Sequence, residues 1–128
     1  MGVAAPDTGT VYVSDSNNHR IFKITNNGAT VTLYATAGLP ATNLDPYYWY
    51  KPEACSFVTV AGSGLAIGDA FVADTGNNRV VKIPANNGAR VKYGPTTVSS
   101  LAYSPIDIVY SKTGGSIYII DGLNNRLI

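Results

Sequence analysis

The chain has 128 residues, of which 45% are apolar and 13% are charged, a composition typical of an ordered globular protein rather than a disordered tail. Nine Lys and Arg residues are offset by eight Asp and Glu residues, which gives a net charge of +1. Because no excess of basic residues is present to attract phosphate backbones, binding to nucleic acid is not expected.

The first predicted unit occupies residues 1–35 and consists of four short strands. Its apolar runs are rich in β-branched residues, too short for helices and separated by turn formers, which is the pattern of strands. The turn Asn26-Asn27-Gly28 before the last run is of the Asn-Gly type that joins hairpin strands. The strands are predicted at residues 2–5, 10–14, 20–24 and 30–35.

An insert at residues 36–52 follows, and prolines at positions 46 and 52 bracket its aromatic part. The four consecutive aromatic residues are Tyr47, Tyr48, Trp49 and Tyr50. Neighbouring side chains of an extended segment point in opposite directions, so some should pack against the protein while others face solvent. Prolines stiffen the segment, and rigid aromatics with polar tips are common in binding hot spots. Two alternatives are open: contact with a ligand or partner, or packing as a lid or filler between sheets.

The second predicted unit occupies residues 53–95 and the third occupies residues 96–128. In the second unit we expect an inner strand, a hairpin and an outer strand at residues 56–60, 70–83 and 90–93. In the third unit an inner strand at residues 105–110 precedes a hairpin that stops at Ile128. The third unit therefore lacks its fourth strand.

The single cysteine and the short apolar runs limit two further features. Cys55 cannot form an intrachain disulfide, and the apolar residues around it in the sequence predict a buried thiol. No apolar run approaches the ~20 residues needed to cross a bilayer, so no membrane span is expected. Neither observation identifies a cellular compartment.

The strongest pattern is a hairpin motif that occurs three times, at residues 11–24, 70–83 and 117–128. In each copy an apolar run ends on Asp, a small polar turn follows, and an Arg stands five residues after the Asp. The pairs are Asp15 and Arg20, Asp74 and Arg79, and Asp121 and Arg126. Each pair can meet across its loop, either to fix the loop's shape or to contact a ligand.

The turn residues of the motif tolerate positive φ, which tight hairpin loops require. They are the pairs Asn17-Asn18, Gly76-Asn77 and Asn124-Asn125. Repeats of this spacing are typical of arrays of blades, in which one unit cannot bury its own faces.

This motif resembles the NHL repeat, with an Ile-Tyr-Val-Ala-Asp-like strand, an Asn-His or Asn-Arg loop and an Ile-x-x-Phe/Ile strand. Asn18-His19-Arg20 keeps the Asn-His pair, with Arg20 where the family name has Leu. The resemblance covers essentially the whole chain except residues 36–52. It implies an all-β fold, a β-propeller segment of about three four-stranded antiparallel blades with the last blade incomplete.

Three blades are fewer than the roughly 4 to 8 that close a propeller ring. A lone segment would expose the apolar faces of its end blades and two sheet edges. Three arrangements are open: two chains that close a six-bladed ring as a dimer, a chain that is part of a longer propeller, or an open arc.

The function we expect is a non-catalytic module that binds a protein or peptide partner through one loop face. In propellers the links between blades and the hairpin loops emerge on a common face, which would place the insert aromatics beside the hairpin loops. The other candidate contact residues are Asn17, Asn18, His19, Asn77 and Asn78. His19 stands where the other copies have Asn, which favours a loop residue over a ligand.

No metal and no cofactor are expected, because a protein zinc site usually needs three or four ligands and the chain has one His and one Cys. The resemblance also implies an alternative, a propeller enzyme of the lyase or hydrolase type with a metal in its central channel. Its site would be incomplete in this chain. In that case Asp107, on the third inner strand, is the carboxylate expected to line the channel.

Overall fold

The computed structural model of the chain describes residues 1–5, 7, 9–35, 49–86, 88–93 and 104–128, and these residues form three antiparallel sheets. The first sheet contains β1 (Gly2–Ala4), β2 (Thr10–Asp15), β3 (Arg20–Thr25) and β4 (Thr30–Ala35). The second contains β5 (Pro52–Phe57), β6 (Ala70–Asp74), β7 (Arg79–Ile83) and β8 (Val91–Tyr93). The third contains β9 (Pro105–Ser111), β10 (Ser116–Asp121) and β11 (Arg126–Leu127).

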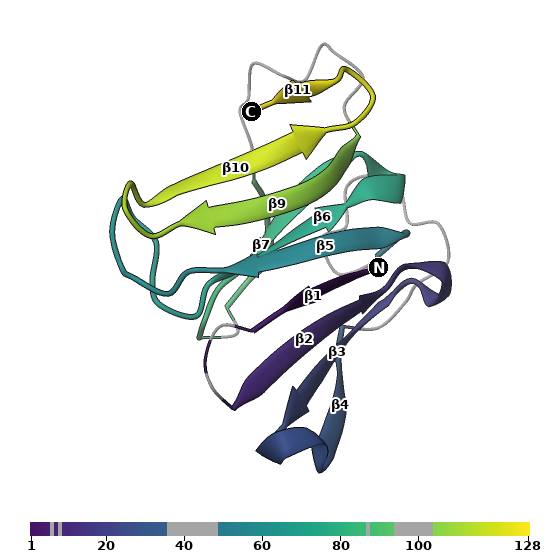
Figure 1. The fold of residues 1–128 in the computed structure, drawn as a ribbon, viewed down its shortest axis with the longest axis vertical. Coiled ribbons are helices and arrows are strands. Elements are labelled where there is room, and N and C mark those ends of the chain that lie inside the picture. Colours follow the sequence, from purple (N-terminus) through teal and green to yellow (C-terminus); the bar gives the residue numbers. More distant parts are fainter. Residues whose placement is uncertain (6, 8, 36–48, 87, 94–103) are drawn as a thin grey trace.

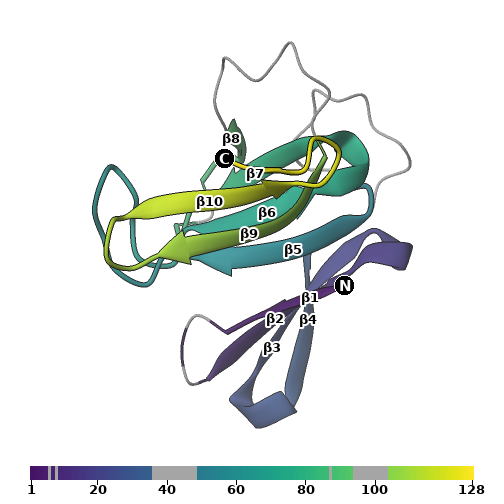
Figure 2. The same cartoon turned by 45° about the horizontal axis from the view of Figure 1, so that its top comes forward.

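These sheets are called blades 1, 2 and 3, and they confirm the predicted all-β propeller fold. Each is a meander of antiparallel neighbours, and the inner strands β1, β5 and β9 lie side by side (Figure 1). Figure 2 shows blade 1 set at an angle to the other two blades. Within the described part of the chain, no helix is long and apolar enough to cross a membrane.

The inner strand of blade 2 differs from the sequence prediction, which placed it at residues 56–60. β5 instead begins at Pro52, because the first position of a strand tolerates a residue that has no N–H to donate. The strand ends at Phe57, because Val58 leaves the ladder. The Val58 N–H donates to the Asp69 carbonyl and the Val58 carbonyl accepts from the Gly68 N–H, which closes a loop.

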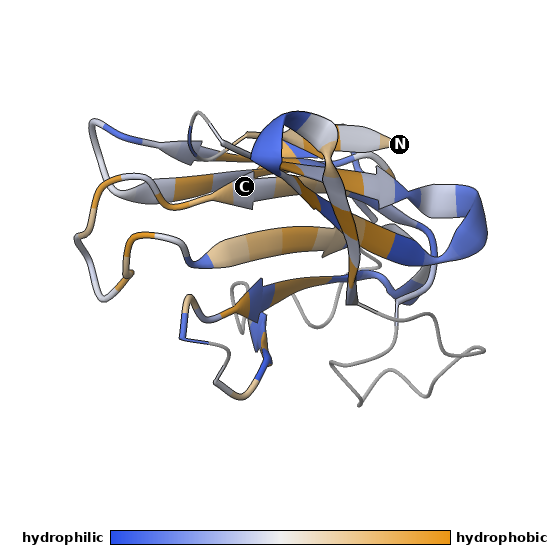
Figure 3. Cartoon of the chain, turned by 90° about the horizontal axis from the view of Figure 1, so that it is seen from below, coloured by the Kyte–Doolittle hydropathy of each residue, from blue (hydrophilic) through white to orange (hydrophobic). Residues whose placement is uncertain are grey.

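The core consists of two apolar layers, one on each side of blade 2. Alternate side chains of a strand point to opposite faces, so Ala70 and Val72 of β6 enter the layer against blade 1 while Phe71 and Ala73 enter the layer against blade 3. All five residues of β6 are buried for this reason. Figure 3 shows hydrophobic colour along the strands and hydrophilic colour at several turns.

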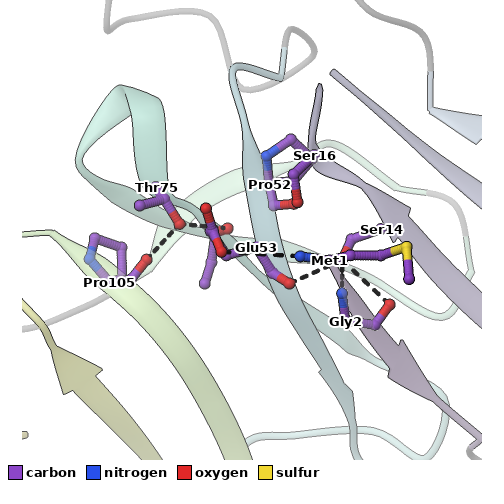
Figure 4. Close-up of polar contacts among 9 residues, drawn as sticks. Met1, Gly2, Ser14, Ser16, Pro52, Glu53, Thr75 and Pro105 are labelled. Carbon is purple, nitrogen blue, oxygen red and sulfur yellow. Dashed lines mark hydrogen bonds and ion pairs between the residues drawn. The ribbon is translucent and has the colours of Figure 1, made fainter. Parts of the chain in front are cut away.

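Neighbouring blades are also joined by hydroxyl groups of the repeat motif (Figure 4). Ser16 Oγ donates to the Pro52 carbonyl at 2.7 Å, and Thr75 Oγ1, at the same motif position in blade 2, donates to the Pro105 carbonyl at 2.6 Å. In both cases the acceptor is the proline that begins the next inner strand.

Close approach of β1 and β5 depends on a glycine. A Cβ added to Gly2 would lie 2.6 Å from the Glu53 carbonyl oxygen, which is too close for any side chain. Ser14 Oγ accepts from the Gly2 N–H at 2.7 Å and donates to the Glu53 carbonyl at 2.9 Å (Figure 4). The small residues Gly2 and Ser14 thus set the spacing between blades 1 and 2.

Candidate binding site on the loop face

The hairpin loops of the motif lie at the same end of the three blades (Figure 1). In blades 1 and 2 the loop is a single 3-10 turn, at Ser16–Asn18 and Thr75–Asn77. The left-handed residue that ends each loop is His19 (φ 56°), Asn78 (φ 51°) or Asn125 (φ 50°). Asn and His are among the side chains that adopt this conformation most readily, which accounts for the residue types at this position.

This geometry corrects the expectation that positive φ falls on Asn17-Asn18 and Gly76-Asn77, because it falls one residue later. The 3-10 turn occupies the three residues after Asp, and only the residue after the turn must reverse the chain. In the third copy, the expected position Asn125 does have positive φ.

In all three motifs an Asp accepts hydrogen bonds from an Asn three residues later and an Arg five residues later. Asp15 accepts from Asn18 Nδ2 at 3.0 Å and from Arg20 Nε at 2.8 Å. The distances to Asp74 are 2.8 Å from Asn77 and 2.7 Å from Arg79, and those to Asp121 are 2.8 Å from Asn124 and 2.9 Å from Arg126. Each Asp therefore meets its Arg across the loop, with the Asn as a third member.

The three ion pairs differ in burial. The Asp74 and Arg79 side chains are 0% and 2% exposed, whereas those of Asp15 and Arg20 are 26% and 42% exposed. In blades 2 and 3 the second Asp oxygen also holds the start of the blade, since Asp74 accepts from the Tyr50 N–H at 2.8 Å and Asp121 from the Ser104 N–H at 3.0 Å. These carboxylates therefore join the hairpin loop to the segment that precedes the inner strand.

The surroundings shift the pKa values of these carboxyl groups in different directions. Hydrogen bonds from Arg20 and Asn18 lower the pKa of Asp15. Burial alone would raise the pKa of Asp121, but hydrogen bonds from the Ser104 N–H, Asn124 and Arg126 outweigh it and lower the pKa to about 2. At Asp74 burial is the largest influence and raises the pKa, although Asn77, the Tyr50 N–H and Arg79 act in the opposite direction.

Tyr50 is wedged between the hairpin loops of blades 1 and 2. Its carbonyl accepts from the Gly76 N–H at 2.8 Å, and a Cβ on Gly76 would overlap the Tyr50 ring. The His19 and Tyr50 rings lie 4.9 Å apart. The Lys51 N–H donates to His19 Nδ1 at 3.1 Å, so the neutral imidazole carries its proton on Nε2. The backbone of Tyr50 and Lys51 is therefore held by both blades.

The remaining predicted contact residues occupy different environments. Asn17, Asn18 and Asn78 are exposed on the loops, as is Lys51, which the sequence analysis did not select. Asn77 is buried and donates its amide to Asp74. The sequence feature that could have indicated Lys51 is its position between the aromatic run and Pro52.

The four insert aromatics do not share one environment. Trp49 is 0% exposed and packs in the layer between blades 1 and 2, with the Arg90 guanidinium 5.5 Å from its ring. This position favours the packing alternative for Trp49. Tyr50 is half-buried on the loop face. Tyr47 and Tyr48 lie outside the described residues.

A concave surface, separate from the loop residues, runs along the inner strands. This cleft has a volume of about 320 Å³ and is lined by small residues of β1 and β5 and by Asp107 of β9. Cys55 also lines the cleft but is 6% exposed, and burial raises the pKa of its thiol to about 12. No three His, Cys, Asp or Glu side chains gather into a metal-binding group within the ranges that the structure describes.

Comparison with known proteins identifies the repeat and the fold. Residues 2–24 match the family model of the NHL repeat. No curated protein sequence matches the chain. Solved structures share its fold at low identity, and the chain spans between 35% and 41% of the three proteins described next.

An auxiliary nutrient binding protein from Bacteroides thetaiotaomicron superposes with a TM-score of 0.74 at 16% identity, over 98% of this chain and 35% of that protein. The nidogen/laminin complex gives a TM-score of 0.68 at 16% identity, over 100% of this chain and 41% of the matched one. Virginiamycin B lyase from Staphylococcus aureus gives 0.65 at 17% identity, over 99% of this chain and 36% of the lyase.

Proposed function

Because the chain is a β-propeller segment whose first blade contains an NHL repeat, we propose that it is a non-catalytic module that binds a protein or peptide through its loop face. The loop face is defined here by the described residues at the hairpin end of blades 1 and 2. They are Asn17, Asn18, His19, Tyr50, Lys51 and Asn78.

The observation that carries the proposal is the fixed backbone of Tyr50 and Lys51. Hydrogen bonds from Gly76 and to Asp74 and His19 hold this dipeptide before any partner arrives. A contact segment that is already ordered loses less conformational entropy on binding. Tyr50 offers an amphipathic ring and Lys51 an exposed cation, and both suit the carbonyl and carboxylate acceptors of a polypeptide.

One of the similar structures is a complex between nidogen and laminin, and another is of a nutrient binding protein. Binding is therefore compatible with this fold. The identities of 16% limit that support to the fold, and the contact residues are argued from this chain alone.

Site-specific photo-cross-linking tests the proposal. A benzophenone amino acid at Asn17, on the loop face, is compared with the same group at Lys112, an exposed residue of the β9–β10 turn at the opposite end of the blades. We expect Asn17 to cross-link one specific protein in an extract of the source cells and Lys112 not to do so. Equal cross-linking from both positions, or from Lys112 alone, would contradict the loop face as the contact surface.

The alternative is a propeller enzyme of the lyase or hydrolase type with a metal in the central channel. Asp107 in the inner-strand cleft favours it, and virginiamycin B lyase is among the proteins of similar fold. Metal analysis of the purified protein separates the two functions. Stoichiometric zinc or calcium that is lost in Asp107→Asn supports the enzyme, and metal-free protein that still binds its partner supports the binding module.

The proposal also includes self-association. Three blades fall short of the roughly 4 to 8 in closed propellers, so a second chain would complete a ring of about six.

A further inference from the structure

The face of blade 1 that points away from blade 2 is apolar across all four strands. Strand pairing aligns Val3, Val13, Phe22 and Leu33 in one row from β1 to β4. A second row contains Val11, Ile24 and Val31. We call these seven side chains the leading face. Three of them are far from buried, with Val3, Val31 and Leu33 exposed by 64%, 59% and 48%. Figure 3 views the molecule from the blade 1 end.

The same motif positions in blade 2 show what such a face normally contacts. Cys55, Val72 and Val81 pair across β5, β6 and β7 as Val3, Val13 and Phe22 pair in blade 1. They are only 6%, 1% and 0% exposed, because the preceding blade covers them. The leading face thus has the chemistry of a surface that this fold buries under a neighbouring blade.

The face of blade 3 that points away from blade 2 is the counterpart. It contains Val109, Tyr118, Ile120 and Leu127, which are 56%, 42%, 42% and 65% exposed, and we call it the trailing face. The equivalent residues of blade 1 are Ala4, Tyr12, Ser14 and Ile21, which face blade 2.

Two residues of the trailing face differ in character from their equivalents in blade 1, since Ile120 stands in place of Ser14 and Asp107, which pairs with Ile120, stands in place of Gly2. Its hydroxyl link is also absent, because Gly122 occupies the position of Ser16 and Thr75. A contact made by the trailing face would therefore rest on apolar packing of Val109, Tyr118, Ile120 and Leu127, with Asp107 as its one carboxylate among these paired residues.

Side-chain volumes match the two faces to each other. In the contact between blades 1 and 2, the Tyr12 ring stacks on Phe57 at 4.2 Å beside the small Ala4. If the trailing face met the leading face of another copy, Tyr118 would approach Ala5, which replaces Phe57. Val109 replaces Ala4 and supplies the bulk that Ala5 lacks. A close-packed contact requires this kind of compensation.

We propose that the trailing face of one chain packs on the leading face of a second copy, and the reverse, around a two-fold axis. Both faces of both chains are then covered, and the ring has about six blades, within the range of closed propellers. This inference rests on the self-association proposed above and is independent of the loop-face contact. Closure places Asp107 of each chain at the contact with the second copy, beside the inner-strand cleft.

The absolute mass of the chain in solution, measured by light scattering across a dilution series, tests this arrangement. We expect a mass of twice 13.5 kDa for the wild type. Val3→Glu on the leading face and Leu127→Glu on the trailing face should each weaken the dimer by about a hundredfold or more. The ring has two contacts between a trailing and a leading face, and each substitution places a carboxylate in both of them. Ile67→Glu, which changes a loop side chain that is 63% exposed, is the matched control and should remain dimeric.

Three results would overturn the proposal: a monomeric wild type at all concentrations, larger open assemblies, or dissociation by only one of the two face variants. The last result would mean that like faces pair. Mixing the two variants distinguishes a blocked contact from misfolding. Val3→Glu keeps an intact trailing face and Leu127→Glu an intact leading face, so one contact can still form between the two variants. A two-chain species that forms only in the mixture supports the proposal, and its absence from a mixture of folded variants counts against it. If Asn17 cross-links no partner, the loop-face proposal fails, but the masses expected here stay the same. The two proposals can therefore fail separately.

Discussion

The buried ion pair of blade 2 should be far more important for stability than its counterpart in blade 1. Asp74→Asn and Asp15→Asn make the same chemical change at the same motif position, but the Asp74 side chain is 0% exposed and that of Asp15 is 26% exposed. Asn at position 74 can still accept from the Tyr50 N–H, whereas its own amide hydrogens would face the Arg79 Nε–H. The buried guanidinium would lose its carboxylate.

Removing one partner of a buried ion pair costs about 3–5 kcal/mol, because the remaining charge is left unpaired away from water. An exposed pair contributes about 0–1 kcal/mol. Since domains are stable by about 5–15 kcal/mol, Asp74→Asn would remove a large share of the free energy of unfolding and Asp15→Asn a small one.

Urea unfolding measures both losses. Trp49 is the only tryptophan and is buried between blades 1 and 2, so its fluorescence reports that layer while circular dichroism reports the sheets. The m-value should remain constant if both variants retain the native fold. Equal losses for the two variants would refute the argument that burial sets the contribution of the motif pair.

Three further variants test the loop, the insert and the acidic motif. Gly76→Ala should destabilise the chain by about 1–3 kcal/mol and displace Tyr50, because a Cβ at position 76 has no room. Gly62→Ala is the control and should do neither, because the structure leaves open space at position 62. Urea unfolding compares the free energies of unfolding of the two variants. Trp49→Ala should cost about 3–5 kcal/mol, and a melting temperature close to the wild-type value would show that Trp49 is not a packing residue. The pKa of Asp121 is lowered from 3.8 to about 2, so its contribution to stability is complete above about pH 4 and is lost as the pH falls towards 2. Asp121→Asn should therefore flatten the acid side of the plot of unfolding free energy against pH. An unchanged plot would contradict the lowered pKa.

The sequence predicted the hairpin motif well because the motif is local. Asp, Asn and Arg interact within five residues of one another, so a repeated spacing is enough to indicate their contact. The positive φ was misplaced by one residue at His19 and Asn78, because the choice between a two-residue turn and a 3-10 turn depends on hydrogen bonding that residue types alone do not fix.

The insert was harder to interpret because its partners are distant in sequence. Trp49 is buried by side chains of two blades, while Tyr50, one residue later, is held by hydrogen bonds to loops of both. Alternation predicts that adjacent aromatics diverge but does not say which one points inward. Asn77 illustrates the same limit, since its residue type does not show that it is buried with its amide donating to Asp74.

The burial difference between the Asp15 and Asp74 pairs also lies beyond the repeat pattern. The same three residue types occur in both motifs, and only the placement of neighbouring segments makes one pair nearly inaccessible to water.

The affinity of the cross-linked partner for two lysine variants tests the loop face most directly. Lys51→Ala removes an exposed cation from the loop face, and Lys112→Ala removes one from the opposite end of the blades. Isothermal titration with that partner should give at least about tenfold weaker binding for Lys51→Ala and an unchanged affinity for Lys112→Ala. Equal affinities for the two variants, or a loss at Lys112 alone, would contradict binding through the loop face.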